Sequence, residues 1–305
     1  MGTWAWGDSG TSGDGYFGST LSQSSLEQVA DDARAAGLTL WDTALVYGIG
    51  RSETVMGRVL RRFDRAEYQL STKFTPQIAG SGHDPVADML DQSLTNLGTE
   101  YVDLYWIHNP PDVARWTPSP IPLLESGKVR HVGVSNHDLE EIQLADRILG
   151  EAGYRVEAVQ NHYSLLYRSS ENAGILDYCR RNDIAFYAYM VLEQGALSGR
   201  YGVDNPLPLG STRAEVYNGM LPQLQYLSER LTELGRLRGA WAAEVETAWA
   251  NAKGATPIIG VTKPQYVDGL VRATHITLSQ DEIGELESLA DSASVDTRGS
   301  WEHEM

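Results

Sequence analysis

Four ionisable residues of this 305-residue chain stand at or near the ends of apolar stretches: Asp42, Tyr47, Lys73 and His108. A tyrosine can act as a general acid when its pKa falls from about 10 toward the working pH, and a nearby ammonium group lowers that pKa. A carboxylate beside the lysine would keep it charged, and a histidine could orient a carbonyl oxygen. Together they could polarise a C=O group and deliver a proton, while a cofactor supplies the electrons.

Each of these residues, taken alone, has a structural interpretation. An aspartate at a strand end is usually a turn former or a helix cap, a lysine there is usually solvated, and a histidine is usually a satisfied structural residue. The four become a candidate site only if the fold brings consecutive strand ends to one mouth.

Apolar stretches recur along the chain, with helix-like segments between them. Continuous apolar stretches, rather than strict alternation, are typical of parallel strands covered on both faces. Eight such strands alternating with helices predict one (β/α)8 TIM-barrel domain over residues 1–305, with its chemistry at the carboxyl ends of the strands. The predicted strands span residues 2–6, 38–42, 68–74, 101–108, 130–136, 155–161, 184–190 and 256–261.

A doubly wound sheet is the rival architecture. It would be expected to carry the G-x-G-x-x-G dinucleotide fingerprint after an early strand, but "GDSGTSGDG" at 7–15 has the wrong spacing. The irregular segment 200–225 is longer than a connection needs, as functional or mobile loops often are. A helix is predicted over 24–37, with Ser25 and Gln28 as a capping box. Its apolar face would comprise Leu26, Val29, Ala30 and Ala33.

The composition argues against several partners and sites. Acidic residues outnumber basic ones by 41 to 24, and the net charge of -17 argues against nucleic acid or an anionic membrane as a partner. No apolar run reaches about 18 residues and no secretory signal is visible, so we expect a cytoplasmic protein. Cys179 is the only cysteine, which excludes an internal disulfide and a cysteine-based zinc site. We predict no metal site.

Six segments of the chain match a pattern found together in one enzyme family. They are "WDTALVYGIGRSE" at 41–53, "STKF" at 71–74, "DLYWIHNP" at 103–110, "GKVRHVGVSN" at 127–136, "AVQNHYSLL" at 158–166 and "TPIIGVTKP" at 256–264. With these segments the chain resembles the aldo-keto reductase family, and the resemblance covers nearly its whole length. It implies an NADPH-dependent reductase on a (β/α)8 barrel, which would reduce an aldehyde or ketone to an alcohol by hydride transfer.

The resemblance also implies roles for individual residues. Tyr47 would be the proton donor, Lys73 would lower its pKa, Asp42 would pair with Lys73, and His108 would orient the carbonyl group. Substrate would contact Trp4, Tyr47, Trp106 and His108. Because aromatic residues recur in the predicted pocket walls, an apolar or aromatic carbonyl compound is the expected substrate.

The implied cofactor is NADPH, with NADH as the alternative. Ser135, Asn136 and Gln160 would bind the nicotinamide carboxamide, and the ring of Tyr189 would stack on the nicotinamide. Small residues after the seventh strand would let the backbone approach the pyrophosphate. The other implied cofactor-binding residues are Gly2, Thr3, Trp4, Asp42, Leu192, Gln194, Gly195, Leu197, Gly199, Gly260, Thr262, Lys263 and Tyr266.

The chain departs from the family pattern in three places. It begins directly at the first predicted strand, so the barrel apparently lacks the hairpin that usually covers its bottom. Thr262, Tyr266 and Leu270 stand where the family commonly has an Arg, a Gln or Glu, and an Asn, which weakens the preference for NADPH over NADH. Met190 and Val191 replace residues of a common "YSPL" segment and should alter the packing near the nicotinamide.

Two other functions remain open at this stage. The chain could be a cofactor-binding regulatory or sensing subunit that has the same fold and turns over little. It could also be a barrel isomerase or hydrolase that uses Asp42, although that leaves the "GVSN" and "TPIIGVTKP" segments unexplained. The sequence predicts no oligomeric state.

Overall fold

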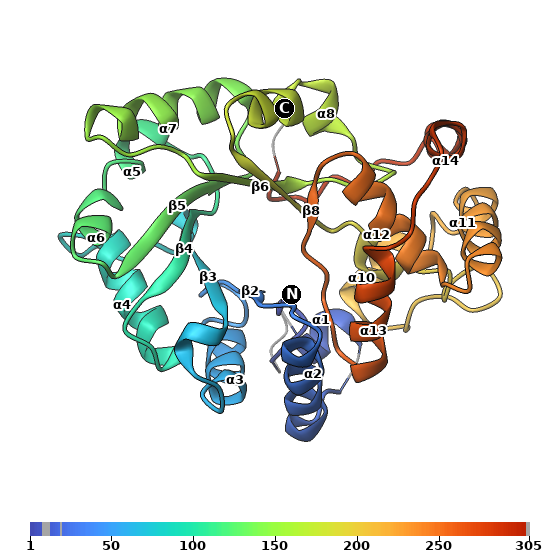
Figure 1. The fold of residues 1–305 in the computed structure, drawn as a ribbon, viewed down its shortest axis with the longest axis horizontal. Helices are drawn as coiled ribbons and strands as arrows, with labels where there is room; N and C mark the ends of the chain where they lie inside the picture. The colour runs from blue at the N-terminus through green and yellow to red at the C-terminus, as the bar shows by residue number, and fades with distance from the viewer. Residues whose placement is uncertain (8–12, 19, 303–305) are drawn as a thin grey trace.

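The computed structural model describes residues 1–7, 13–18 and 20–302, which form a barrel of parallel strands ringed by helices (Figure 1). The strands lie side by side in chain order from β2 to β8, and each pairs in parallel with the next. The predicted (β/α)8 barrel is confirmed. The strands are β2 (Leu40–Asp42), β3 (Gln69–Phe74), β4 (Val102–Ile107), β5 (Val129–Ser135), β6 (Ala158–His162), β7 (Ala185–Tyr189) and β8 (Thr256–Pro257).

Gly2 closes the barrel between its first and last strands. It forms parallel bridges to both Asp42 and Gly260. The N–H of Thr3 also donates to the carbonyl of Asp42 at 3.0 Å, but the N–H of Trp6 turns back to the carbonyl of Thr3 at 2.8 Å. The strand predicted over 2–6 is therefore wrong beyond its first residues, because the chain turns where the strand was expected to continue.

Strand β8 is also shorter than the predicted 256–261. Pro257 has no N–H with which to extend a ladder. Beyond it, the N–H of Ile258 still donates to the carbonyl of Ala188 at 2.8 Å, so the chain stays beside β7 without forming a longer strand.

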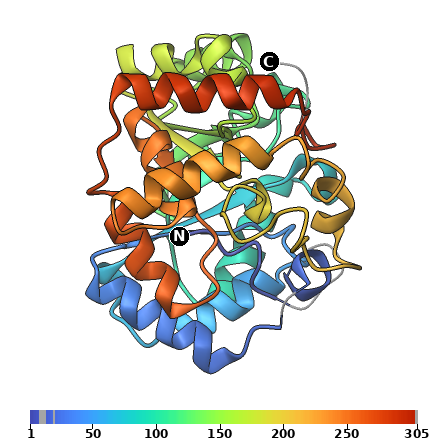
Figure 2. The same ribbon diagram turned by 90° about the vertical axis from the view of Figure 1, so that its right-hand side faces the viewer.

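The helices lie outside the sheet. Figure 2 shows α14 running along the outer side of the barrel, while α1, α10 and the C-terminal segment gather at one end. The helices are α1 (Gly13–Phe17), α2 (Gln23–Ala35), α3 (Arg51–Leu60), α4 (Pro85–Leu97), α5 (Val113–Trp116), α6 (Ile121–Glu125), α7 (Leu139–Glu151), α8 (Ser169–Asn172), α9 (Ile175–Arg181), α10 (Thr212–Tyr217), α11 (Gln225–Leu237), α12 (Ala242–Ala252), α13 (Pro264–Ala273) and α14 (Gln280–Ala293). The described residues also include the short 3-10 helices η1 (Arg65–Glu67), η2 (Pro76–Ile78) and η3 (Glu193–Gly195).

The predicted capping box of helix α2 is wrong. The N-cap is Ser22, whose hydroxyl accepts a hydrogen bond from the N–H of Ser25 at 3.2 Å. Gln28 donates instead to Asp32 at 2.8 Å. The polar residues after Ser22 extend the helix toward its N-terminus, so the cap precedes the predicted position. The predicted apolar face is confirmed, because all four of its members are buried: Leu26, Val29, Ala30 and Ala33.

We expect Ser22→Ala to lower the free energy of unfolding by about 1 kcal/mol, because the N–H of Ser25 would lose its acceptor. Urea unfolding followed by circular dichroism measures this change. Ser25→Ala is the matched control and should change the free energy by less than about 0.5 kcal/mol. A larger loss in the control than in Ser22→Ala would place the cap at Ser25.

A continuous apolar core fills the space between the sheet and the helices. Cys179 belongs to it and is 1% exposed, and burial raises the pKa of its thiol to about 12. It is therefore a protonated, unreactive core residue. No helix in the described part of the chain has the length and apolar character that crossing a bilayer requires.

Candidate active site

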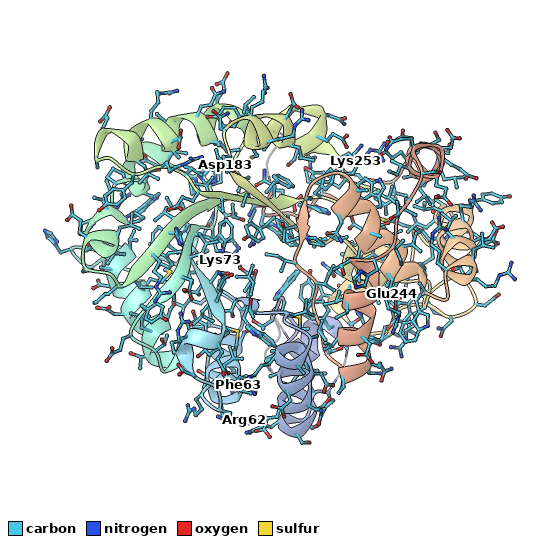
Figure 3. All side chains as sticks on the ribbon, in the orientation of Figure 1. Arg62, Phe63, Lys73, Asp183, Glu244 and Lys253 are labelled. Carbon is cyan, nitrogen blue, oxygen red and sulfur yellow. The ribbon has the colours of Figure 1, made fainter. Side chains whose placement is uncertain are left out.

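A buried ion pair lies at the carboxyl end of the strands. Lys73, on β3, points into the barrel (Figure 3), and its Nζ lies 2.5 Å from Oδ2 of Asp42 at the end of β2. It also donates to the carbonyl of Thr43 at 2.8 Å. Side-chain exposure is 0% for the lysine and 4% for the aspartate. Such a pair needs further hydrogen bonds, because burial removes both charges from water.

The second oxygen of Asp42 receives those hydrogen bonds. Oδ1 accepts from the hydroxyl of Ser71 at 2.6 Å, the indole N–H of Trp106 at 3.1 Å and the amide of Gln160 at 3.1 Å. Donors from three further strand positions therefore fix the carboxylate that holds Lys73. Trp106 is fully buried and packs with Leu104, so its predicted substrate contact is corrected to support of Asp42.

Tyr47 lies over the lysine, and its electrostatics differ from the expectation. The Nζ of Lys73 is 5.0 Å from the centroid of the Tyr47 ring. Burial raises the pKa of Tyr47 above its ordinary value, and this outweighs the lowering effect of the Lys73 ammonium. Burial alone would lower the pKa of Lys73, but Asp42 and Tyr47 outweigh it and raise that pKa. At neutral pH the phenol is therefore protonated and the amine charged.

His108 follows β4 and faces Tyr47, with the two ring centroids 6.1 Å apart. Burial and the nearby Lys73 charge hold the pKa of His108 well below its usual range, so the ring is neutral. Its Nδ1 lies 2.8 Å from the hydroxyl of Thr75. When that hydroxyl donates to Nδ1, the ring hydrogen sits on Nε2, where it can be donated to a carbonyl oxygen.

A cavity of about 1090 Å³ runs from Tyr47 to helix α13. Most of the residues expected to bind cofactor line it; the exceptions are Ser135, Asn136 and Leu197. Leu197 is fully buried in the core, so its predicted place beside the pyrophosphate is not supported. The expected residues that line the cavity are Gly2, Thr3, Trp4, Asp42, Gln160, Tyr189, Leu192, Gln194, Gly195, Gly199, Gly260, Thr262, Lys263 and Tyr266.

Asn136 lies behind the cavity wall. It adopts a left-handed conformation after β5, with φ of 61°, and its amide nitrogen donates to the carbonyl of His108 at 2.9 Å. Its amide oxygen accepts from the hydroxyl of Tyr189 at 2.6 Å. Asn136 therefore links the histidine to the expected nicotinamide-stacking ring.

The loop that follows β7 has an unusual backbone. Met190, Glu193 and Gln194 all have positive φ, and Gly195 has φ of 107°. Non-glycine residues rarely adopt such conformations, and their clustering is characteristic of ligand-binding loops. The side-chain Oε1 of Gln194 is buried without a partner among the described residues.

Cationic residues outside the expected cofactor-binding set also line this cavity. The guanidinium of Arg213 donates to the backbone carbonyl of Gln194 at 2.9 Å, while its Nε has no partner among the residues described. Arg200 and Arg236 contribute further positive charge. Arg200 and Arg213 fall in segment 200–225, whose length is unusual for a connection and which proves to contain helix α10, while Arg236 lies on α11. A mainly apolar cavity lined by several cations fits an elongated anionic ligand.

A family comparison explains this combination of barrel, buried lysine pair and long cavity. The sequence profile described as Aldo/keto reductase family matches residues 1–291. The chain belongs to this family. Membership places it among oxidoreductases that reduce carbonyl groups.

Individual relatives agree with that assignment. An aldo-keto reductase of Gibberella moniliformis is 28% identical over 293 residues, covering 90% of this chain and 86% of its own length. The NADP(+) aldo-keto reductase yakc of Schizosaccharomyces pombe is 27% identical over 293 residues, covering 90% of this chain and 85% of its own. The structure of an aldo-keto reductase from Klebsiella pneumoniae in complex with NADPH superposes with a TM-score of 0.72 at 25% identity, covering 95% and 89%.

Proposed function

We propose that the protein reduces an aldehyde or ketone to an alcohol with NADPH, and that Tyr47 is the proton donor. The observation that carries the proposal is the buried Lys73–Asp42 pair beneath Tyr47, at one end of a cavity large enough for a dinucleotide. The pair places a fixed positive charge where a phenolate would form.

The cavity suggests which residues would hold the cofactor. The amide of Gln160, which lines the cavity, would bind the nicotinamide carboxamide. Tyr189 would stack on the ring, while Asn136, outside the cavity lining, would hold the Tyr189 hydroxyl. Arg213 would neutralise the pyrophosphate. NADPH is proposed over NADH because Arg200 and Lys263 line the cavity and could hold a 2′-phosphate in a chain of net charge -17. The NADP(+) in the name of the S. pombe relative and the NADPH in the K. pneumoniae structure support this choice.

The bound cofactor would supply a hydride to the carbonyl carbon. The chain's own residues would handle the oxygen. His108 Nε2–H and the Tyr47 hydroxyl donate hydrogen bonds to it, and Tyr47 then transfers its proton as the negative charge develops. Lys73 stabilises the phenolate that remains, and Asp42 keeps Lys73 charged and in place.

The raised pKa of Tyr47 predicts opposite pH dependences for the two directions. Reduction needs the phenol, so kcat should stay constant from about pH 6 to 9 and decrease only as Tyr47 ionises near or above its ordinary pKa of about 10. Alcohol oxidation needs the phenolate, so kcat should rise about tenfold per pH unit over the same range. Steady-state pH profiles in both directions test this. A pH-independent oxidation rate would contradict it.

Cofactor consumption tests the proposed function as a whole. NADPH and NADH would each be supplied with a panel of aromatic aldehydes and ketones, and binding would be followed separately by quenching of protein fluorescence. We expect turnover with NADPH and a weaker response to NADH. Tight binding without turnover on any compound would favour a cofactor-sensing subunit, and failure to bind either cofactor would overturn the proposal.

A further inference from the structure

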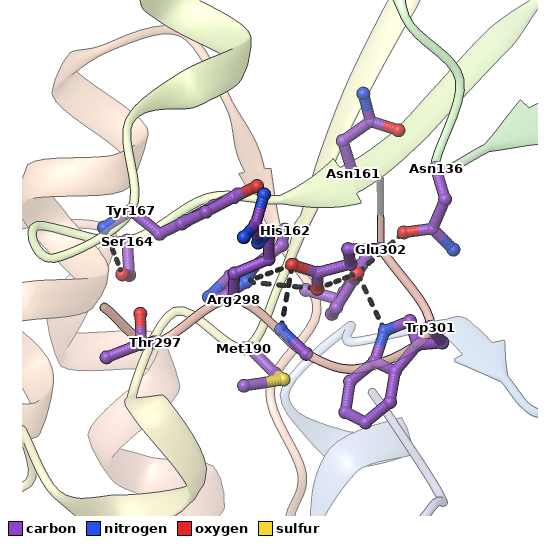
Figure 4. A network of polar contacts seen from close by, with 12 residues as sticks. Asn136, Asn161, His162, Ser164, Tyr167, Met190, Thr297, Arg298, Trp301 and Glu302 are labelled. Carbon is purple, nitrogen blue, oxygen red and sulfur yellow. Dashed lines mark hydrogen bonds and ion pairs between the residues drawn. The ribbon is translucent and has the colours of Figure 1, made fainter. Parts of the chain in front are cut away.

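The C-terminal segment returns to the active site and buries a carboxylate there (Figure 4). Both carboxylate oxygens of Glu302 lie close to Nδ1 of His162, at 3.1 and 3.2 Å. On the other side of the ring, Nε2 of His162 lies 2.9 Å from Oε1 of Glu193. All three side chains are 0% exposed. One imidazole thus connects the C-terminal segment to the loop that follows β7.

Glu193 is itself firmly held. Its Oε2 accepts from the hydroxyl of Tyr217 at 2.7 Å, and its Oε1 accepts from Thr297 at 3.1 Å and from Ser164. Burial alone would lower the pKa of His162, but the carboxylates of Glu193 and Glu302 outweigh it and raise that pKa to about 9. At neutral pH the ring is therefore an imidazolium between two carboxylates.

The same tail residues bind the hydroxyl of Tyr189. Oε1 of Glu302 lies 2.5 Å from this hydroxyl, and the indole N–H of Trp301 donates to it at 3.2 Å. The indole of Trp301 also packs edge-on against Trp4, with centroids 5.8 Å apart, and Trp4 stacks beside Tyr47 at 5.9 Å. The tail therefore contacts both the expected nicotinamide-stacking ring and the aromatic wall beside the proton donor.

We infer that His162 and Glu302 are positioning residues: they fix the C-terminal segment against Tyr189, so that its ring is held ready for the nicotinamide. This inference rests on the proposed function. Nothing in the hydride or proton transfer itself requires these two side chains. Their effect on the reaction passes through Tyr189 and through the placement of Trp301.

The contact should weaken in alkaline solution. Because the pKa of His162 is higher in the folded chain, at about 9, than its ordinary 6.5, the stabilisation is complete below pH 6.5 and is lost as the pH rises through 9. Glu246 of α12 lies close enough to Glu193 to interact with it, and burial, together with the Glu193 charge, raises the pKa of Glu246 well above its usual range. The titratable groups that face the imidazole are Glu193, Glu302, Tyr167 and Tyr189. Those that face its partner Glu193 are Tyr217 and Glu246.

Limited proteolysis tests the contact without relying on activity. Trypsin cuts after Arg298, whose side chain is 41% exposed, but the residues that follow must leave the site before they can enter the protease. Mass spectrometry would follow this cut in the wild type, His162→Gln, Glu302→Ala and Glu302→Gln. His131→Gln is the matched control, because His131 pairs with Glu157 at 2.7 Å on an exposed surface.

We expect cleavage at pH 7.5 to become about tenfold faster in His162→Gln and Glu302→Ala, because each variant loses a hydrogen bond between charged groups. The increase in cleavage rate should be smaller in Glu302→Gln. Relative to His162→Gln, cleavage of the wild type should accelerate toward pH 9.5. The variant has no imidazole at this position, so its cleavage rate gains nothing from deprotonation of His162. Equal rates in the wild type and all variants would overturn the contact.

The positioning role is tested by the KM for NADPH. It should rise about tenfold in Glu302→Ala and be largely restored in Glu302→Gln, which keeps an oxygen for Tyr189. Faster cleavage with an unchanged KM would overturn the positioning role. If the wild type turned over no carbonyl compound, the proposed function would fail while the cleavage rates still decided the contact.

Discussion

Replacing Tyr47 with phenylalanine should lower kcat for carbonyl reduction by about 10³-fold, the scale of contribution that a positioned general acid makes. The variant loses the hydroxyl that donates the proton but keeps the ring that packs beside Trp4 and over Lys73. Cofactor affinity should therefore stay within about twofold, a change well below the loss of a whole contact. Stopped-flow turnover and fluorescence titration with NADPH measure the two quantities.

Tyr16→Phe is the matched control for this experiment. Tyr16 also packs against Trp4, with ring centroids 4.6 Å apart, but its hydroxyl contacts Gln194 rather than Lys73. Its removal should change kcat by less than about threefold, since it makes no contact with the proton-transfer residues. If Tyr47→Phe kept more than a tenth of wild-type kcat, another group would have to supply the proton.

The second large effect concerns the buried pair. Lys73→Met should lower the free energy of unfolding by about 3–5 kcal/mol, because it leaves the Asp42 carboxylate buried without its partner. It should also reduce kcat, since nothing then stabilises the Tyr47 phenolate. Urea unfolding measures the stability.

A double variant separates these two consequences. Asp42→Asn in the Lys73→Met background removes the uncompensated charge while leaving an amide oxygen for Ser71, Trp106 and Gln160. Most of the lost stability should return, whereas kcat should stay low. A double variant as unstable as Lys73→Met would show that the charge of Asp42 is not what destabilises the single variant.

The barrel and the strand-end residues could be predicted because both follow local rules. Parallel strands bring their carboxyl ends together, so Asp42, Lys73 and His108 had to share one mouth once the strands were recognised. The direction of the pKa shift of Tyr47 did not follow, because it depends on how far burial outweighs the charge of Lys73. How deeply a loop residue such as Tyr47 is buried depends on the folded pocket around it and not on the neighbouring sequence.

Other features depended on distant parts of the chain. Trp106 resembles a pocket residue in sequence, yet it is enclosed by neighbouring strands and donates to a carboxylate 64 positions away. Arg213 lies on helix α10, whose six residues are too few to give a periodic signal in the sequence. His162 and Glu302 are separated by 140 positions, so no local pattern could have paired them. In each case the tertiary contact determines the role.

Transfer of deuterium from C4-deuterated NADPH tests the central claim most directly. Purified protein would be given the labelled cofactor and an aromatic aldehyde that it turns over, and the alcohol would be examined by mass spectrometry and NMR. We predict deuterium at the carbinol carbon, from one face of the nicotinamide only, with the hydroxyl proton taken from Tyr47 and hence from solvent. The 4R- and 4S-deuterated cofactors would be used in turn, and an alcohol that carries no deuterium on carbon with either of them would contradict hydride transfer from the cofactor and with it the proposed mechanism.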